Sequence, residues 1–126
     1  MKAALIGPRL EENLGLCYLQ SSLEAKGHEA RIFDFHAAAQ IPEIVSQVID
    51  FAPDLVGLSM VYTARAREFV DLAAALRQAG FAGHITAGGH FASFHAHNLL
   101  TRFPAFDSIV HGEGEEKIVD LIEHLA

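Results

Sequence analysis

The stretch Gly83-His-Ile-Thr-Ala-Gly-Gly-His-Phe-Ala-Ser-Phe94 predicts a short buried strand that runs into adjacent glycines and then into a helix. Ile85 to Ala87 form the strand, and Gly88 and Gly89 follow at its carboxyl end. In open α/β sheets, ligands bind at the carboxyl ends of the strands. Because glycine has no Cβ, such a turn lets a flat ligand or a phosphate-bearing tail approach the main chain closely. A tight turn without a ligand is the alternative, and the rest of the chain has to decide between the two.

The same alternation of short apolar runs and amphipathic stretches continues along the chain. Strands are predicted at residues 2–7, 30–35, 55–61, 85–87 and 108–110, and helices at 13–27, 43–51, from after 63 to 80, 91–103 and 115–126. A repeated strand-helix pattern implies a parallel sheet with right-handed crossovers. We therefore expect one α/β domain over residues 1–126, Rossmann-like (flavodoxin-like), with a five-stranded parallel sheet of order 2-1-3-4-5 and helices on both faces.

Composition excludes several classes of protein. Among 126 residues there are 16 acidic and nine basic side chains, with no cluster of lysine or arginine, which disfavours a nucleic-acid partner. The single cysteine, Cys17, excludes an intrachain disulfide and a multi-cysteine metal site, and it fits a reducing compartment. The first apolar run, Ala3 to Ile6, is too short for a signal peptide or a membrane span. We expect a cytoplasmic protein.

If the strand order holds, four loops meet at the carboxyl edge of the sheet: residues 8–13, 59–63, 88–91 and 111–114. Ser59 stands near the end of an otherwise apolar strand, so its hydroxyl is available to a ligand or to the next helix. His111-Gly-Glu-Gly114 offers backbone amides at the start of a helix, which suits an anion, although a simple turn explains it equally well.

Other kinds of site lack the residues that they need. His90, His95 and His97 are clustered, but their spacing matches no standard zinc site, and we expect a solvated helix face. No Gly-x-Gly-x-x-Gly follows the first strand, which disfavours a nicotinamide nucleotide despite Asp34 at the end of the second strand. The paired acids of a response-regulator receiver and the Gly-x-Ser-x-Gly elbow of a hydrolase are also missing from the sequence. No catalytic residue and no metal ligand is predicted.

Four segments in order and spacing together resemble one known family. They are residues 13–29, Pro53-Asp-Leu-Val-Gly-Leu-Ser59, Ile85-Thr-Ala-Gly-Gly-His-Phe-Ala-Ser93 and Asp107-Ser-Ile-Val-His-Gly-Glu-Gly-Glu115. They are similar to the amino-terminal cobalamin (vitamin B12)-binding domain of radical S-adenosylmethionine (SAM) enzymes, the group with methyltransferases and the anaerobic magnesium-protoporphyrin monomethyl ester cyclase. The resemblance covers essentially the whole chain. It implies a domain that holds cobalamin at the carboxyl edge of its sheet and presents it to a radical SAM catalytic domain or subunit.

The resemblance also implies where the cofactor lies. The nucleotide tail of cobalamin inserts beside the serine and glycine-pair loops in that family, and Ser59 and Gly88-Gly89 match those positions. The expected cofactor-binding residues are Arg9, Leu10, Glu11, Asn13, Leu14, Ser59, Met60, Val61, Tyr62, Thr63, Gly88, Gly89, His90, Phe91, His111, Gly112, Glu113 and Gly114.

One departure from related cobalamin domains concerns the lower ligand of cobalt. Mutases and methionine synthase take a histidine from Asp-x-His-x-x-Gly after the first strand, where this chain has Gly7-Pro-Arg-Leu-Glu-Glu12. Asp34-Phe-His36 follows the second strand and lacks the closing glycine. The resemblance to the radical enzymes therefore implies base-off cobalamin without a protein histidine on cobalt. Its lower face would meet Arg9, Leu10 or Glu11. The lack of a strong lower donor would favour lower coordination of cobalt and ease its reduction towards the methyl-accepting state.

The catalytic barrel of that family carries Cys-x3-Cys-x2-Cys, which a chain with one cysteine cannot supply. The chain is therefore expected to be either a piece of a longer enzyme or a free-standing cobalamin carrier, with no catalysis of its own. The alternative is a flavodoxin-like domain that binds another small ligand, such as a flavin, or a non-catalytic interaction module. A Ser/Thr cluster after the first strand would favour flavin, and the sequence has none there.

Overall fold

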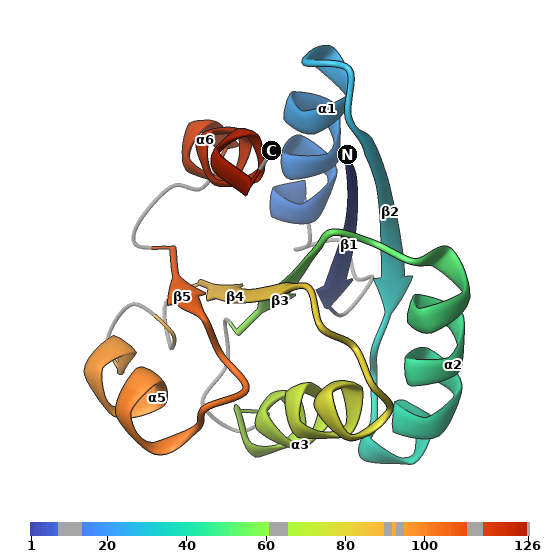
Figure 1. The fold of residues 1–126 in the computed structure, drawn as a ribbon, viewed down its shortest axis with the longest axis vertical. Helices are drawn as coiled ribbons and strands as arrows, with labels where there is room; N and C mark the ends of the chain where they lie inside the picture. Colours follow the sequence, from blue (N-terminus) through green and yellow to red (C-terminus); the bar gives the residue numbers. More distant parts are fainter. Residues whose placement is uncertain (8–13, 61–65, 90–91, 93–94, 111–114, 126) are drawn as a thin grey trace.

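The computed structural model describes residues 1–7, 14–60, 66–89, 92, 95–110 and 115–125. Within them, a single parallel sheet takes the order β2-β1-β3-β4-β5 (Figure 1). The strands are β1 (Lys2–Gly7), β2 (Glu29–Asp34), β3 (Leu55–Ser59), β4 (His84–Gly88) and β5 (Ser108–Ile109). The predicted fold class and strand order are confirmed.

Helices cover both faces of this sheet (Figure 1). Helices α1 (Leu14–Ala25) and α6 (Glu115–Leu125) lie on one face, and α2 (Ile41–Phe51), α3 (Ala66–Gln78) and α5 (Ala96–Arg102) lie on the other. A short 3-10 turn, η2 (Ala38–Gln40), precedes α2. None of the helices in the described part of the chain has the length and apolarity that crossing a lipid bilayer requires.

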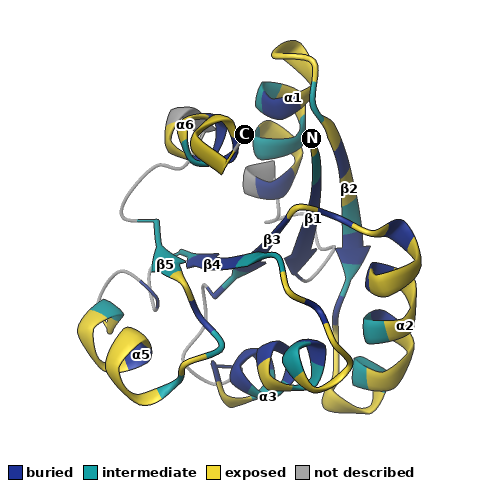
Figure 2. Cartoon of the chain, viewed as in Figure 1, coloured by how far each residue is buried: buried dark blue, intermediate teal, exposed yellow. Residues whose placement is uncertain are grey.

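The core consists of two hydrophobic clusters separated by the sheet. Along β1, Leu5 belongs to the cluster under α1 and α6, whereas the next residue, Ile6, belongs to the cluster under α2, α3 and α5. This alternation follows from the two-residue period of a strand. Both residues are fully buried. Strand β1 is buried over most of its length (Figure 2), as expected for a central parallel strand that is covered on both faces.

The strand ends are level along the carboxyl edge, and this geometry brings the predicted loops together. Gly7 of β1 is the register partner of Asp34 in β2, and Ser59 of β3 is the register partner of Gly88 in β4. On the far side of β4, the amide of Val110 donates to the carbonyl of Ala87 at 2.8 Å. The starting points of the predicted loops therefore share one edge of the sheet.

Some predicted boundaries and faces are wrong. The third strand ends at Ser59 rather than residue 61. The helix predicted over 91–103 is not continuous: Ala92 is helical, the backbone of His95 is not, and α5 spans Ala96–Arg102. The apolar residues Ile44, Val45, Val48 and Ile49 predict one buried face for α2, but Ile49 is 38% exposed, because the buried side chains are Ile44, Val48 and Phe51. The apolar periodicity of the last helix likewise predicts that Leu125 points inward, but it is 36% exposed at the end of α6.

Candidate functional site

The structure describes part of the predicted site. Ser59, Met60, Gly88 and Gly89 are described, and Leu14 is placed as the first residue of α1. The remaining predicted residues lie outside the described residues, and their roles stay predictions: Arg9, Leu10, Glu11, Asn13, Val61, Tyr62, Thr63, His90, Phe91, His111, Gly112, Glu113 and Gly114.

Small side chains occupy one face of β3 at the carboxyl edge. Leu58 and Met60 belong to the cluster under α2, α3 and α5, so Ser59 between them faces the α1 and α6 side. Gly57 faces the same side, because a Cβ added there would lie 3.2 Å from Leu5, a residue of that cluster.

The neighbouring strand β4 repeats this pattern. Ile85 and Ala87 belong to the cluster under α2, α3 and α5, so Thr86 and Gly88 face the α1 and α6 side. Together with β3, they define a small-residue floor at the carboxyl edge, made of Gly57, Ser59, Thr86 and Gly88. Gly57 and Thr86 are buried, and a Cβ at Gly57 would meet Leu5 and Ile118, whereas Ser59 and Gly88 at the strand ends are partly exposed.

Gly88 is the position of this floor that the described residues leave uncovered. Among the described residues, the nearest neighbour of a Cβ added at Gly88 would be Val110, with the carbonyl oxygen at 3.7 Å and Cβ at 3.8 Å, both ordinary contacts. By contrast, a Cβ at Gly83 would come within 2.6 Å of Phe81 and 2.8 Å of the carbonyl oxygen of Asp54. Packing among the described residues therefore explains glycine at 83 and does not require it at 88. A ligand that approaches the main chain closely at position 88 would require glycine there.

Gly89 has a different reason to be glycine. Its φ is 101°, a backbone conformation that other residues adopt only with strain, and Gly88 has no positive φ. The two adjacent glycines therefore have different roles. Gly89 allows the turn after β4, and Gly88 leaves the main chain at the end of β4 without a side chain.

Met60 contributes to the site through its main chain. Its side chain is fully buried in the core, and its amide donates to the carbonyl of Gly88 at 2.7 Å. This bond extends the pairing of β3 with β4 one residue beyond Ser59. It holds the Ser59 and Gly88 positions side by side at the edge.

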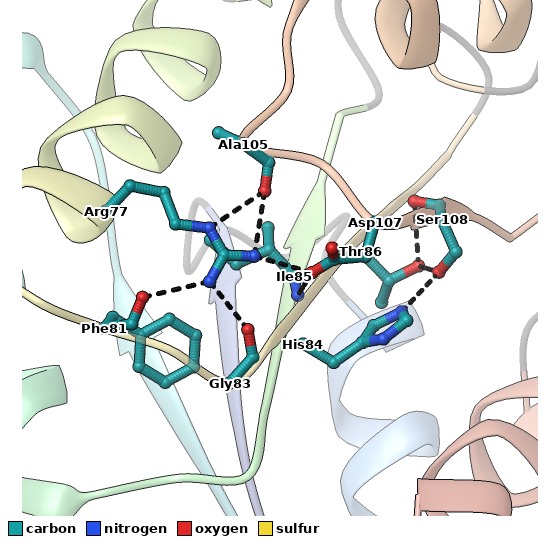
Figure 3. A network of polar contacts seen from close by, with 9 residues as sticks. All are labelled: Arg77, Phe81, Gly83, His84, Ile85, Thr86, Ala105, Asp107 and Ser108. Atoms are coloured by element: carbon teal, nitrogen blue, oxygen red, sulfur yellow. Dashed lines mark hydrogen bonds and ion pairs between the residues drawn. The ribbon is translucent and has the colours of Figure 1, made fainter.

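A polar network between β4 and β5 lies on the same face and is absent from the predicted site (Figure 3). The hydroxyl of Ser108 donates to Oγ1 of Thr86 at 2.8 Å, and Nε2 of His84 lies 2.8 Å from the Ser108 hydroxyl. Thr86 is 1% exposed, and among the described residues it is the one buried polar side chain. Its position inside an apolar strand was the available sequence signal, the same signal that pointed to Ser59.

A second network approaches β5 from the α3 side (Figure 3). The guanidinium of Arg77 donates to the carbonyls of Phe81, Gly83 and Ala105, and it pairs with the Asp107 carboxylate at 2.6 Å. The same carboxylate oxygen accepts from the amide of Ile85 at 2.9 Å. These bonds join the end of α3 to the starts of β4 and β5 and have a structural role.

The histidines do not form a metal centre in the described part of the chain. His36, His95 and His97 are exposed, and His90 lies outside the described residues. Among the described residues, no group of three or more histidine, cysteine, aspartate or glutamate side chains is placed to hold a metal ion.

A hollow of about 550 Å³ lies elsewhere, between β2 and α2, at the opposite end of the sheet from β4 and β5. Two of its polar side chains are engaged within the chain: the amide of Gln47 donates to Glu43 at 3.2 Å, and Gln40 accepts from the amide of His36 at 2.6 Å. It does not coincide with the predicted site.

A parallel sheet of this strand order, with small residues at its carboxyl edge, is the architecture in which α/β domains commonly bind small ligands. The model of the B12 binding domain family matches residues 9–122. The chain therefore belongs to the B12-binding domain family, and cobalamin is its cofactor.

Comparison with known proteins shows which members of this family the chain is similar to. It is 33% identical over 116 residues to the hopanoid C-3 methylase of Methylococcus capsulatus, a match that covers 91% of this chain and 22% of that protein. It is 32% identical over 126 residues to the anaerobic magnesium-protoporphyrin IX monomethyl ester cyclase of Synechocystis sp., covering 95% and 25%. The structure of the cobalamin-dependent S-adenosylmethionine radical enzyme OxsB, without bound ligand, superposes with a TM-score of 0.76 and 27% identity, covering 98% of this chain and 18% of that one.

The resemblance inferred from the four sequence segments is confirmed by these relatives. The chain spans about a quarter of the length of the curated relatives that it matches.

Proposed function

We propose that residues 1–126 act as one cobalamin-binding domain that holds the cofactor base-off, without a protein histidine on cobalt. We propose further that it carries cobalamin in the cytoplasm for a radical SAM catalytic domain or subunit of the methyltransferase or cyclase type. The observation that supports the site is the space that the described residues leave beside Gly88, next to Ser59, on a domain whose family binds B12. When bound, cobalamin supplies methyl transfer or cobalt-centred redox chemistry.

The chain's own residues bind and orient the cofactor in this proposal. The main chain at Gly88 lies against it without a side chain in between, and the hydroxyl of Ser59 on the neighbouring strand donates to its polar tail. Backbone amides at the predicted 111–114 turn bind the phosphate of the tail, as helix starts commonly do for anions. The predicted residues Arg9, Leu10 and Glu11 meet its lower face.

Two features of the described residues support the absence of a histidine ligand. β1 ends at Gly7, and the residue types that follow it supply no histidine up to the start of α1. His36 follows β2, an edge strand that lies three strand spacings from β4, roughly 14 Å across the sheet. Its backbone amide donates to Gln40, which holds this segment at the edge.

The partnership rests on the relatives. OxsB is a cobalamin-dependent radical enzyme, and this chain covers 18% of its length. The methylase and the cyclase are likewise several times longer than the stretch that matches. In the proposal, the chemistry takes place on such a partner, which approaches the upper face of the bound cofactor.

Retention of cobalamin by the purified protein tests the function. The protein is mixed with hydroxocobalamin, methylcobalamin or flavin mononucleotide, and free ligand is removed by gel filtration. The expected result is stoichiometric retention of both cobalamins, with an absorption spectrum of the base-off form. Retention of the flavin in place of cobalamin would support the alternative ligand, and retention of neither at generous excess would overturn the proposal.

A further inference from the structure

The shortest strand of the sheet carries one wall of the candidate site. β5 has two residues, Ser108 and Ile109, which pair with Thr86 and Ala87 of β4. Val110 comes directly after β5, and its carbonyl oxygen and Cβ are the described atoms nearest to a Cβ added at Gly88. The width of the opening at Gly88 therefore depends on where β5 is held.

Backbone pairing of so short an edge strand is limited. The amide of Asp107 donates to the carbonyl of Ile85 and the amide of Val110 donates to that of Ala87, both at 2.8 Å. Two-residue pairing on one side leaves few bonds to resist a shift in register or a fraying of the edge. Side chains on the floor face of the sheet supply additional bonds.

These bonds form a closed set between Thr86, Ser108 and His84. The hydroxyl of Thr86 donates to the carbonyl of Ser108 at 3.2 Å, and the hydroxyl of Ser108 donates to Oγ1 of Thr86 at 2.8 Å. Each hydroxyl has one proton, so all contacts are satisfied together only when Nε2 of His84 donates to the Ser108 hydroxyl, 2.8 Å away. In this arrangement His84 donates to Ser108 rather than accepting its proton.

We propose that Thr86, Ser108 and His84 are positioning residues for the cofactor site: they hold β5 against β4 and so set the distance between Val110 and Gly88. The inference rests on the proposed function, because it assigns the opening at Gly88 to cobalamin. It explains why a fully buried strand position carries threonine where an apolar residue of the same shape would fit the core. The hydroxyl is kept for its bonds to Ser108.

The Arg77 and Asp107 network constrains the same strand from the opposite face. It holds the residue before Ser108, whereas the hydroxyl pair acts at the strand itself, one position closer to Val110. Loss of the hydroxyl pair therefore leaves the start of β5 attached and lets its carboxyl end move. Variants of the hydroxyl pair can therefore change cofactor affinity without detaching the start of β5 from the sheet.

Variants of Thr86 test the inference because they separate shape from hydrogen bonding. Thr86→Val keeps the shape and removes the hydroxyl, whereas Thr86→Ser keeps the hydroxyl and loses the methyl group. Gln20→Ala is the matched control, since it removes a side-chain bond to the carbonyl of Ala30 on the opposite edge strand. For each protein, the dissociation constant of hydroxocobalamin, the thermal midpoint without ligand and the amide exchange rate of Val110 are measured.

Thr86→Val and Ser108→Ala are expected to raise the dissociation constant about fivefold to tenfold, as loss of a buried hydrogen bond does, and to speed exchange at the Val110 amide. Thr86→Ser is expected to stay within about twofold of the unmodified protein in affinity, and Gln20→Ala likewise even where its thermal midpoint falls by the same amount. Unchanged affinity in Thr86→Val and Ser108→Ala, or an equal loss in Gln20→Ala, would overturn the inference. If the unmodified protein binds no cobalamin, the proposed function fails, and unchanged exchange at Val110 in the variants would then refute the positioning role separately.

Discussion

Ser59 and Gly88 are register partners at the carboxyl ends of two adjacent parallel strands, β3 and β4, and both face the α1 and α6 side of the sheet. One offers a hydroxyl and the other offers bare main chain. A ligand that lies across this pair contacts both without moving either strand.

Gly88 is the position where a side chain is expected to block the cofactor without unfolding the domain. Gly88→Leu should lower cobalamin affinity by about a hundredfold or more, because the side chain occupies the space of the ligand, as overpacked sites cannot accommodate both. Gly88→Ala should leave the free energy of unfolding within about 1 kcal/mol, since its Cβ makes only ordinary contacts with Val110. Ligand titration and urea unfolding measure the two effects.

The control for Gly88 is Gly83→Ala, in which the added Cβ would meet Phe81 at 2.6 Å and Asp54 at 2.8 Å. This variant should lose stability by about 1–3 kcal/mol, as overpacked sites do. Normal cobalamin affinity in a folded Gly88→Leu protein would show that the ligand lies elsewhere.

Substitution of Gly89 is expected to lower the free energy of unfolding. Its positive φ makes Gly89→Ala cost about 1–2 kcal/mol of unfolding free energy, the usual penalty for placing a side chain in a left-handed conformation. Urea unfolding of the protein without ligand measures this. A Gly89→Ala protein as stable as the original would mean that the turn after β4 relaxes freely.

Ser59 is expected to contribute a hydrogen bond to the bound cofactor. Ser59→Ala should weaken cobalamin binding by about twofold to tenfold, the usual range for one hydrogen bond, with little change in the thermal midpoint. Ser46→Ala on the exposed face of α2 is the matched control and should change neither quantity. Equal affinities for the two variants would remove Ser59 from the site.

His36 is expected to play no part in cobalt coordination. His36→Ala should bind cobalamin with the same base-off spectrum and with an affinity within about twofold of the original, because an exposed side chain with no contact to the ligand contributes little. Absorption spectra of the loaded proteins provide the comparison. A change of cobalt coordination in this variant would identify His36 as the lower ligand.

Local sequence patterns predicted the order of strands and helices and part of the candidate site. The strand and helix order follows from apolar periodicity, and general rules on crossovers and strand neighbours lead from it to the order 2-1-3-4-5. Ser59 and the Gly88-Gly89 pair were identifiable because a hydroxyl or paired glycines interrupt apolar strands. The exposure of side chains at helix ends, such as Leu125, could not be predicted from the sequence, because it depends on which other elements pack against the helix end.

Only the tertiary structure separated the two glycines: Gly89 is explained by its φ, and Gly88 by the space left beside Val110, a residue of another strand. Only the fold, likewise, showed that Thr86 bonds Ser108 and that Arg77 pairs with Asp107, contacts that join residues 22 and 30 positions apart. The physical reason is the same in each case. Propensity and periodicity act between near neighbours in the chain, whereas the open space and the polar partners at this edge come from strands that meet only after folding.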